Sequence, residues 1–384
     1  MIQSIELTNF KAIKQKYFPL GKLNLLLGLN GQGKSSFIQS LLLLRQSDKL
    51  PNGELKLNSG ENGLVNIGTS QDALYQYSPN NEFSIGLQFK EQAPYCMNFI
   101  HQMDADILKQ KSTDSIDRKL LEHNSEEALF NSKFQYLNAQ RIEPKATNIA
   151  SYSNVMEANS IGKHGQYTAH YIELRGNEPI QFDNLLHPKS KTVDRFTKKE
   201  TVDRRLLNQI NLWLGEISPG VNVITSKIST DIILLEYEFE QPNLGSTNKF
   251  KPENVGFGIS YSLHVLTALL SAQPGGLVII ENPESHIHPQ GQSTLGRLIT
   301  LLALNDVQIV IETHSDHILN GIRVGIKEHP ALKDETMLFF FKKIVDKHEQ
   351  FASVINIKID KNGTLSNYPQ HLLDEWSNQL SKLV

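Results

Sequence analysis

Three glycines, a lysine and a serine fall within eight residues of the chain at a spacing that suits phosphate chemistry. The pattern G-x-x-x-x-G-K-S is met by Gly28-Leu29-Asn30-Gly31-Gln32-Gly33-Lys34-Ser35. In such a loop backbone N–H groups surround a triphosphate, the lysine ammonium reaches its β- and γ-phosphates, and the serine hydroxyl binds Mg²⁺. We therefore predict that Lys34 serves both binding and catalysis, and that Ser35 is a metal ligand.

An acidic residue and a histidine end two other apolar runs. Leu277 to Ile280 predicts a buried parallel strand, and Glu281 follows at its carboxyl end, where a carboxylate can bind Mg²⁺ directly or through water. After the next predicted strand, 307–311, comes His314, which can hydrogen-bond a γ-phosphate or the water that attacks it. We predict catalytic roles for Glu281 and His314.

The segments around these residues predict the elements that position them. Leu23 to Leu27 is an apolar strand before the glycine loop, and apolar residues recur at helical spacing after it. A helix N-terminus carries free N–H groups and partial positive charge, so the loop becomes an anion site. A second run, Gly256 to Ser260, precedes another apolar helix and suits the same purpose, although a capped helix after a loop is the alternative.

Together these motifs resemble the ABC-class ATPases, most closely the branch of the SMC, RecF and overcoming-lysogenization-defect proteins. Finer details are similar to small bacterial AAA-labelled ATPases that carry a C-terminal domain of unknown function and often stand near anti-phage genes. The resemblance covers residues 1–50, 134–146 and 254–345. It is carried by Asn30-Gly31-x-Gly33-Lys34-Ser35-Ser36, Gly258-Ile259-Ser260, Ile280-Glu281-Asn282-Pro283-Glu284 with His288-Pro289, and Thr313-His314-Ser315.

The resemblance implies a role for each matching position. It adds Asn30 and Ser36 to the nucleotide-binding loop, makes Glu281 a metal ligand and His314 the switch histidine. It implies that Gln140 or Arg141 senses the metal or the γ-phosphate, that Lys11 lines the nucleotide pocket, and that Gly258 and Ser260 contact the γ-phosphate bound to an opposite subunit. Two chains would then pair head-to-tail around two ATP molecules with Mg²⁺, alone or within a larger assembly.

One departure from the family pattern bears on hydrolysis. The general-base glutamate of the family follows the metal carboxylate, and here that position is Asn282. An amide cannot accept a proton from water. Either Glu284 takes the role of base, or hydrolysis is slow and ATP acts as a clamp. We expect slow but real hydrolysis with Glu284 as the base.

Composition narrows the classes of protein that the chain can belong to. Its 384 residues carry a net charge of −3, which excludes a globally basic nucleic-acid binder. One cysteine, Cys96, excludes an internal disulfide framework, and no apolar run approaches the length of a membrane span. The guanine motif N-K-x-D is not met, since Asn248-Lys249 is followed by Phe250-Lys251. We expect a cytoplasmic ATPase without membrane contact.

The predicted fold is an α/β ABC-type P-loop core, with a parallel sheet, an antiparallel β sub-domain and an α/β insert between the loop half and the signature half. We expect the loop half at 1–145, the insert at 146–253, the signature half at 254–345, and a β/α tail at 346–384. Short strands and turn signals over 53–89 mark the β sub-domain, and 201–214 predicts a helix of the insert. Further along, 232–239 predicts a strand, 291–304 and 372–383 predict helices, and Asp360–Gly363 predicts a hairpin turn.

The biological output has two interpretations. Residues 189–205 hold seven basic and three acidic side chains, a local charge of +4, which suits DNA, although a solvated face is the alternative. The first hypothesis is a DNA-associated sensor or regulator in anti-phage defence that controls a separately encoded effector. The second is a nucleotide-gated scaffold for a protein partner, with negligible turnover and no DNA contact.

Overall fold

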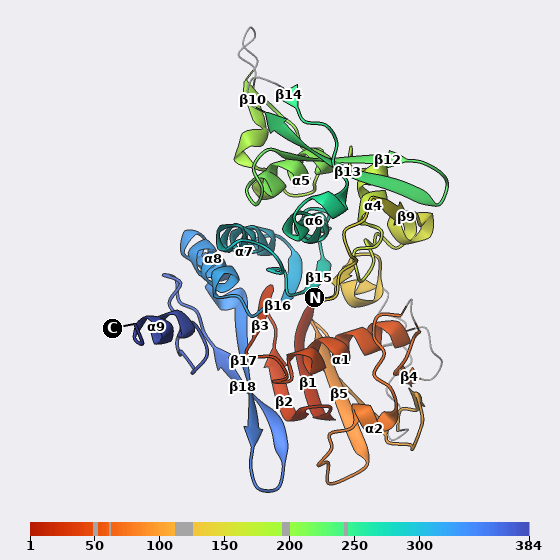
Figure 1. Cartoon of the computed structure of the whole chain (residues 1–384). Coiled ribbons are helices and arrows are strands. Elements are labelled where there is room, and N and C mark those ends of the chain that lie inside the picture. Colours follow the sequence, from red (N-terminus) through yellow and green to blue (C-terminus); the bar gives the residue numbers. More distant parts are fainter. Residues whose placement is uncertain (49–52, 61–62, 112–125, 194–199, 242–244, 384) are drawn as a thin grey trace. The chain divides into compact units, whose positions relative to one another are not determined.

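The chain folds into two compact units in a computed structural model that describes residues 1–48, 53–60, 63–111, 126–193, 200–241 and 245–383. The first unit joins Met1–Asn131 to Ala331–Val384, and the second is Ser132–Pro330. Figure 1 shows both, coloured along the sequence. No helix of these described ranges has the length and apolar character needed to cross a membrane.

The first unit contains an antiparallel sheet with strand order β2-β1-β5-β6 (Figure 1). Its central strand buries Ile5, which stands opposite Phe18 on one side and Leu87 on the other. The antiparallel sub-domain predicted over 53–89 is confirmed. The strands of this sheet and of the small pair beside it are β1 (Ile2–Phe10), β2 (Ile13–Pro19), β5 (Glu82–Phe89), β6 (Tyr95–Ile100), β4 (Leu55–Lys56) and β7 (Ile107–Leu108).

Parallel pairing in the same unit holds the strand that enters the glycine loop. Strand β3 (Leu23–Leu27), fully buried as predicted, pairs in parallel with β17 (Thr336–Val345), and β17 pairs antiparallel with β18 (Gln350–Ile357). Helix α1 (Lys34–Ser47) follows the loop. Its Phe37 packs against Phe18 from β2, with ring centroids 4.9 Å apart. Phe18 also packs against Phe339 of β17, so the N-terminal and C-terminal segments share one hydrophobic core.

Three parallel strands form the sheet at the centre of the second unit, in the order β16-β15-β8. They are β8 (Phe134–Leu137), β15 (Gly276–Glu281) and β16 (Val307–Glu312). The two predicted strands of this sheet are confirmed, and so are helices α6 (Phe257–Leu270) and α7 (Pro289–Ala303). Because the strands run in parallel, their carboxyl ends and the loops that follow them share one edge of the sheet.

Helix α8 (Asp316–Glu328) was not predicted, although Ser315 caps it by accepting N–H bonds from His317 and Ile318. It lies along α7, as Figure 1 shows, and the backbones of the two helices approach each other closely. A Cβ atom on Gly296 of α7 would lie 2.4 Å from the carbonyl oxygen of Ile318, and one on Gly321 would lie 2.3 Å from that of Ser293. The two glycines therefore allow this close crossing.

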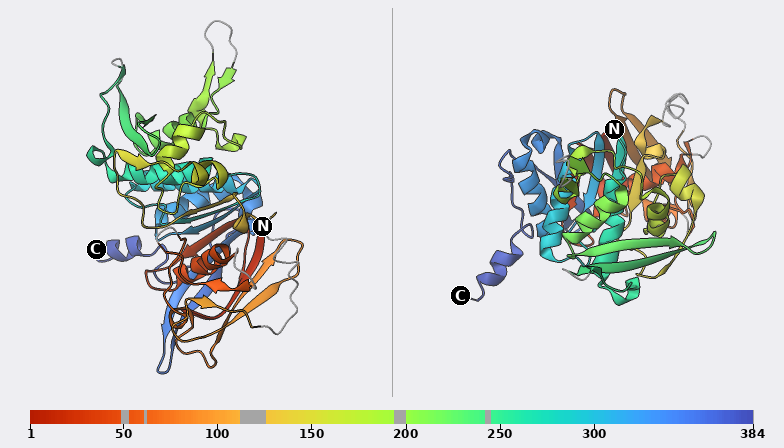
Figure 2. Two further views of the ribbon diagram at one scale, coloured as in Figure 1. Left: turned by 90° about the vertical axis from the view of Figure 1, so that its right-hand side faces the viewer. Right: turned by 90° about the horizontal axis from the view of Figure 1, so that it is seen from above.

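The remainder of the second unit is an α/β region between β8 and α6. Strand β13 (Ile232–Gln241), predicted from its sequence, forms with β12 the long hairpin seen from above in Figure 2. The helix predicted over 201–214 begins only at Leu206, because Glu200–Val202 is a strand paired with Lys191–Val193. The elements of this region are β9 (Thr147–Ile149), α4 (Thr168–Arg175), β10 (Lys191–Val193), β11 (Glu200–Val202), α5 (Leu206–Gly215), β12 (Val221–Lys227) and β14 (Gly245–Ser246).

Short helices complete the two units. The C-terminal helix predicted around 372–383 is the shorter α9 (Glu375–Leu380). The turn predicted at Asp360–Gly363 is confirmed, since the Asp360 carboxylate accepts the backbone N–H groups of Asn362 and Thr364. The other short helices are α2 (Ser70–Ala73), the π-helix Ser153–Glu157, and the 3₁₀ turns Ala128–Phe130, Asp183–Leu185, Pro188–Ser190, Pro252–Asn254 and Pro330–Glu335.

Candidate functional site

The glycine loop between β3 and α1 has a backbone that other residues could not adopt. Gly28, Gly31 and Gly33 have φ angles of 126°, 72° and 101°. A Cβ atom on Gly28 would lie 2.4 Å from the carbonyl oxygen of Phe341, and one on Gly33 would lie 2.7 Å from the Cβ of Ala352. Both the conformation and the space therefore require glycine, and β17 and β18 brace the loop from behind.

The start of α1 presents the backbone N–H groups of a helix N-terminus to a ligand. Gly33 occupies the N-cap in a left-handed conformation and has no side chain with which to cap the helix. Ser35 is exposed in the first turn, whereas Ser36 is buried behind it, and Asn30 is exposed at the tip of the loop. A helix start of this kind binds anions through its free N–H groups.

The Lys34 side chain lies folded over its own loop. Its ammonium donates hydrogen bonds to the carbonyl oxygens of Gly28 at 2.8 Å and Leu29 at 2.9 Å, and the residue is only 3% exposed. Carbonyl oxygens hold this ammonium where the pattern places a phosphate oxygen. An incoming phosphate would take over some of these hydrogen bonds and gain the stronger attraction of a charged pair.

Lys11 and the loop border the same cavity, of about 140 Å³, in the first unit. Lys11 has a positive φ of 51°, and its backbone N–H donates to Ala73 at 2.9 Å. Burial lowers the pKa of its ammonium, while Asp72 opposes this. The cavity is lined by Lys11, Ala12, Gly31, Gln32, Tyr75, Gln76, Tyr77, Lys343, Gln350, Phe351 and Ala352. The structure thus brings Lys11 to the side of the glycine loop.

Glu281 ends β15 in the second unit, and groups from β8 and the segment after it hold its carboxylate. The Tyr136 hydroxyl donates to Oε1 at 2.7 Å, and the Ala139 N–H donates to Oε2 at 3.4 Å. Burial raises the pKa of Glu281, and these two hydrogen bonds and the Arg141 charge counteract the increase. The carboxylate is therefore oriented before any ligand arrives.

Arg141 contacts the backbone of the turn that follows Glu281. Its guanidinium donates to the carbonyl oxygen of Glu281 at 2.8 Å and to that of Asn282 at 3.1 Å, and it is 4% exposed. Burial lowers its pKa to about 10, so it stays protonated at neutral pH. Asn282 has a φ of 45°, a strained angle that this clamp helps to maintain. Gln140, the other predicted sensor, is exposed.

Glu284 and His314 lie together at the edge of the same sheet. The Glu284 carboxylate accepts the Thr313 hydroxyl at 2.8 Å and the backbone N–H of His314 at 2.9 Å. The side chain of His314 is exposed. Strands β15 and β16 pair with Glu281 opposite Glu312, so both turns begin at the same level. The turns after β15 and β16 therefore meet at one edge of the sheet, and the catalytic roles of Glu284 and His314 stay predictions.

The second glycine run starts α6, with Gly256 at its N-cap. Gly258 packs against the turn after β15, because a Cβ atom there would lie 2.4 Å from the carbonyl oxygen of His286. Ser260 is buried, and its hydroxyl lies 3.2 Å from that of Tyr237. The roles of Gly258 and Ser260 toward a neighbouring subunit stay predictions.

His286 and His288 have structural partners. The His286 ring packs edge-on against Tyr261, with centroids 4.8 Å apart, and the His288 ring accepts the N–H of Gln290 at the start of α7. Across the described ranges, no group of three or more His, Cys, Asp or Glu side chains could hold a metal by itself. Both rings are therefore engaged in local packing and helix capping.

The basic stretch 189–205 is largely neutralised where it is described. Four of its cations form ion pairs with carboxylates: Lys189 with Glu216, Lys191 with Glu200, Arg204 with Asp183, and Arg205 with Asp203. The other three, Arg195, Lys198 and Lys199, lie outside the described residues. Paired cations offer less to a phosphate backbone than free ones, which limits the predicted DNA contact.

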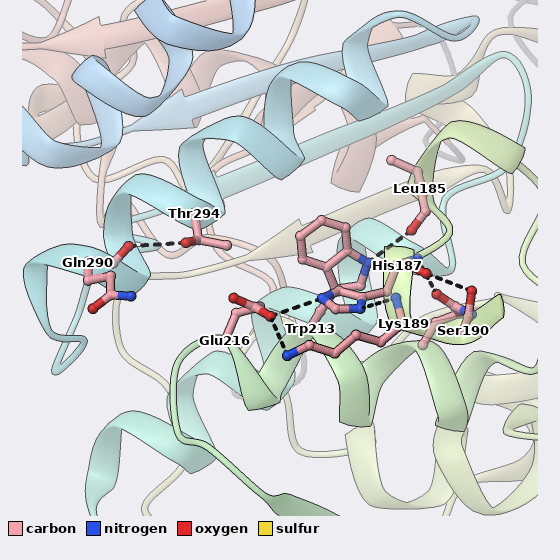
Figure 3. Close-up of polar contacts among 9 residues, drawn as sticks. Leu185, His187, Lys189, Ser190, Trp213, Glu216, Gln290 and Thr294 are labelled. Carbon is pink, nitrogen blue, oxygen red and sulfur yellow. Dashed lines mark hydrogen bonds and ion pairs between the residues drawn. The ribbon is translucent and has the colours of Figure 1, made fainter. Parts of the chain in front are cut away.

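A larger cavity, of about 490 Å³, opens in the second unit between α5, α7 and α8 (Figure 3). Trp213 and the buried His187 line this cavity. The Trp213 indole N–H donates to the carbonyl oxygen of Leu185 at 2.9 Å, and the His187 ring packs edge-on against the indole. Glu216 accepts both the His187 ring and the Lys189 ammonium on one oxygen. Charged side chains that line the cavity form ion pairs with one another. None of the predicted catalytic or nucleotide-binding residues lines the cavity.

Tyr136 and Thr313 are site residues whose roles the sequence did not reveal. Tyr136 stands opposite Ile279 in the parallel register, and side chains two apart on a strand share a face, so its hydroxyl reaches Glu281. Thr313 directly follows β16 beside the predicted His314. The signal for Tyr136 was an aromatic residue in a short apolar segment before Gln140, which could be used only once the pairing of that strand was known.

The chain matches two known protein families. Residues 1–319 match the family described as AAA ATPase domain, and residues 333–383 match a family described as protein of unknown function, DUF3696. No curated protein matches the sequence. The fold is similar to a solved Smc head bound to the C-winged helix domain of ScpA, at 11% identity and a TM-score of 0.53, over 94% of this chain and 98% of that one.

A second solved structure gives the same result. It is an Smc head domain with an extended coiled coil bound to the C-terminal domain of ScpA, derived from Pyrococcus furiosus. The identity is 11% and the TM-score 0.53, over 100% of this chain and 99% of that one. Identities this low establish the fold alone. The predicted mixed α/β fold of the Smc-head, ABC type is thereby confirmed.

Proposed function

Because the chain belongs to the AAA ATPase domain family, we propose that two copies of it close head-to-tail around two molecules of Mg²⁺-ATP and reopen on hydrolysis. The observation that supports this most is the glycine loop, whose backbone and crowding admit only glycine at Gly28 and Gly33. Such a loop ahead of a helix start is typical of phosphate-binding sites. The loop amides, Lys34 and Lys11 would bind the nucleotide.

Ser35 and Glu281 are the residues that would hold Mg²⁺. A hydroxyl and a carboxylate are the oxygen ligands that this ion prefers, with water completing the octahedron. Beside Glu281, the side-chain oxygen of Asn282 is buried and has no hydrogen-bond partner within the described chain, which fits a bound water of that shell. The metal would neutralise charge that develops on the phosphates.

Hydrolysis would be slow, with Glu284 as the base. Asn282 occupies the usual position of the base and cannot take a proton. Each Glu284 oxygen accepts one hydrogen bond, from Thr313 or from His314, and keeps a second lone pair for a water. The exposed His314 side chain would orient that water or the γ-phosphate. Gly258 and Ser260, at the start of α6, would complete the site of the opposite subunit.

The first test measures ATP binding and mass together. Isothermal titration with Mg²⁺-ATP should show binding to the parent protein, and light scattering should show a dimer with ATP and a monomer without it. Binding without any change in mass would contradict the dimer, and no binding would contradict the whole proposal.

For the biological output we propose a DNA-associated sensor that controls a separately encoded effector, in anti-phage defence and in the cytoplasm. The local charge of +4 over 189–205 supports it. The alternative, a nucleotide-gated scaffold without DNA contact, gains support from the four paired cations and from Smc heads that were solved with a bound protein domain.

Charge reversal separates these two outputs. Lys198→Glu with Lys199→Glu should abolish any stimulation of ATPase activity by DNA, while leaving the basal rate unchanged. If DNA never stimulates the parent protein, the scaffold is the better description, and a protein partner encoded nearby should instead change the rate of ATP turnover.

A further inference from the structure

Both carboxylate oxygens of Glu281 are engaged from a single segment of the chain. Tyr136 donates its hydroxyl to Oε1 at 2.7 Å, and three residues further along the chain the backbone N–H of Ala139 donates to Oε2 at 3.4 Å. Tyr136 is 5% exposed on a fully buried strand, so its ring cannot turn away. The carboxylate is therefore held in one rotamer by its neighbours.

Arg141, from the same segment, fixes the backbone on which Glu281 stands. It donates to the carbonyl oxygens of Glu281 and Asn282, and its guanidinium lies over the Tyr261 ring at 5.9 Å. The segment is itself tied down, because the N–H groups of Asn138 and Ile142 donate to Lys163 and His164 at 2.8 and 2.9 Å. In this arrangement neither Tyr136 nor Arg141 is free to swing toward a ligand.

We propose that Tyr136 is a positioning residue for the metal carboxylate, and that the segment from Tyr136 to Arg141 acts on bound Mg²⁺ through Glu281 rather than by touching the nucleotide. This proposal rests on the proposed function, since it concerns the same metal. It narrows the expectation that Gln140 or Arg141 senses the metal or the γ-phosphate to a route through Glu281. The side chain of Arg141 is already committed to two carbonyl oxygens of the Glu281 turn.

The physical reason lies in pre-organisation. A carboxylate that must find its rotamer when the ion arrives loses side-chain freedom at that moment, whereas one held by a hydroxyl and an amide has lost it on folding. Loss of such an outer partner typically weakens metal affinity by about 10- to 100-fold. Nucleotide binding without metal should not depend on Glu281 at all.

The test compares Tyr136→Phe with Tyr171→Phe. The control also removes a buried tyrosine hydroxyl from the second unit, one that donates to Asn159 at 2.7 Å, far in sequence from the metal carboxylate. For each protein, ATP affinity is measured in EDTA and then along a Mg²⁺ titration. We expect Tyr136→Phe to raise the Mg²⁺ concentration at half-saturation by about 10-fold or more, with ATP affinity in EDTA unchanged and Tyr171→Phe like the parent.

A second variant separates indirect from direct action. Arg141→Lys keeps the charge but cannot span two carbonyl oxygens. We expect it to raise the Mg²⁺ requirement in the same way and to leave the ratio of ATP to ADP affinity in EDTA unchanged. A direct contact with the γ-phosphate would change that ratio, and would overturn the indirect route even if Tyr136→Phe misfolded.

The outcomes keep this proposal distinct from the proposed function. If the parent protein binds ATP with a Mg²⁺ requirement and Tyr136→Phe stays within twofold of it, the positioning role is wrong and the proposed function stands. If the parent binds no nucleotide, both fail. If Tyr136→Phe lowers ATP affinity in EDTA as much as in Mg²⁺, its effect is general and the positioning role is also wrong.

Discussion

The carboxylate of Glu284 accepts the backbone N–H of His314 at 2.9 Å and so joins the turn after β15 to the turn after β16. Its other oxygen accepts the Thr313 hydroxyl at 2.8 Å. A carboxylate in this position can therefore either take a proton from water or simply fix the place of the histidine. Substitutions on the two sides of the hydrogen bond distinguish these roles.

We predict that Glu284→Gln lowers the rate of ATP hydrolysis by about 100-fold or more, as the loss of a general base does, and that the ATP-bound dimer accumulates. Thr313→Val keeps the carboxylate and removes one of its donors, so its rate should fall by less than about tenfold, the value of one ordinary hydrogen bond. Phosphate release and light scattering measure both variants. Normal hydrolysis by Glu284→Gln would show that Glu284 is not the base, and equal losses in both would show a positioning role.

Lys34→Ala should weaken ATP binding by about 10- to 100-fold, because it removes hydrogen bonds between an ammonium and the phosphates. Lys16→Ala is the matched control, since its ammonium also donates to a carbonyl oxygen, that of Val354, and Lys16 does not line the cavity beside the loop. Titration calorimetry with Mg²⁺-ATP gives both affinities. The loop assignment would be wrong if Lys34→Ala bound ATP as tightly as the parent.

Gly258→Ala should abolish the ATP-dependent dimer while the monomer still binds ATP. The added methyl group would meet the carbonyl oxygen of His286 at 2.4 Å, so the start of α6 or the turn after β15 must shift. Gly256→Ala is the control, because that glycine has a φ of −62° and no atom within 4 Å of a Cβ. Mass in solution with ATP is the measurement, and a Gly258→Ala dimer of parental stability would contradict the role in trans.

The buried His264 predicts a loss of stability in mild acid. Burial lowers the pKa of its ring to about 3, against 6.5 when unfolded, and the nearby Arg141 charge adds to this. Below pH 6.5 the unfolded chain therefore takes up a proton that the folded chain does not, so the free energy of unfolding falls as the pH drops from 6.5 toward 3. Above pH 6.5 this residue has no effect.

The measurement is urea unfolding at pH 7.5 and at pH 5.5, where most carboxylates stay ionised in both states. His264→Gln, which can still hydrogen-bond Thr168, should show a smaller difference between the two pH values than the parent. The same pH dependence in both proteins would mean that another group is responsible.

The parts of the site that were predictable from sequence are the ones whose signal is local. The run from Leu23 through Lys34 contains its own strand, turn and helix start, and Glu281 and His314 each directly follow a buried apolar run. In every case neighbours along the chain determine the structure. The fold class followed from the order of these local motifs.

What could not be predicted depends on contacts between distant segments. Tyr136 reaches Glu281 only because β8 pairs with β15. The start of α5 was misplaced because Glu200–Val202 pairs with another strand, which overrides its helical pattern. Helix α8 was missed despite a good cap at Ser315 and a clear apolar face.

The C-terminal segment has a consequence for anyone who shortens this protein. Strand β17 and its neighbour β18 come from residues that match a different family from the rest of the chain, yet they press on the backs of Gly28 and Gly33. A truncation after the first family's last matched residue would strip the nucleotide loop of its support. The apparent appendage is thus as much a part of the ATP-binding half as the motif itself, and expression boundaries should enclose both.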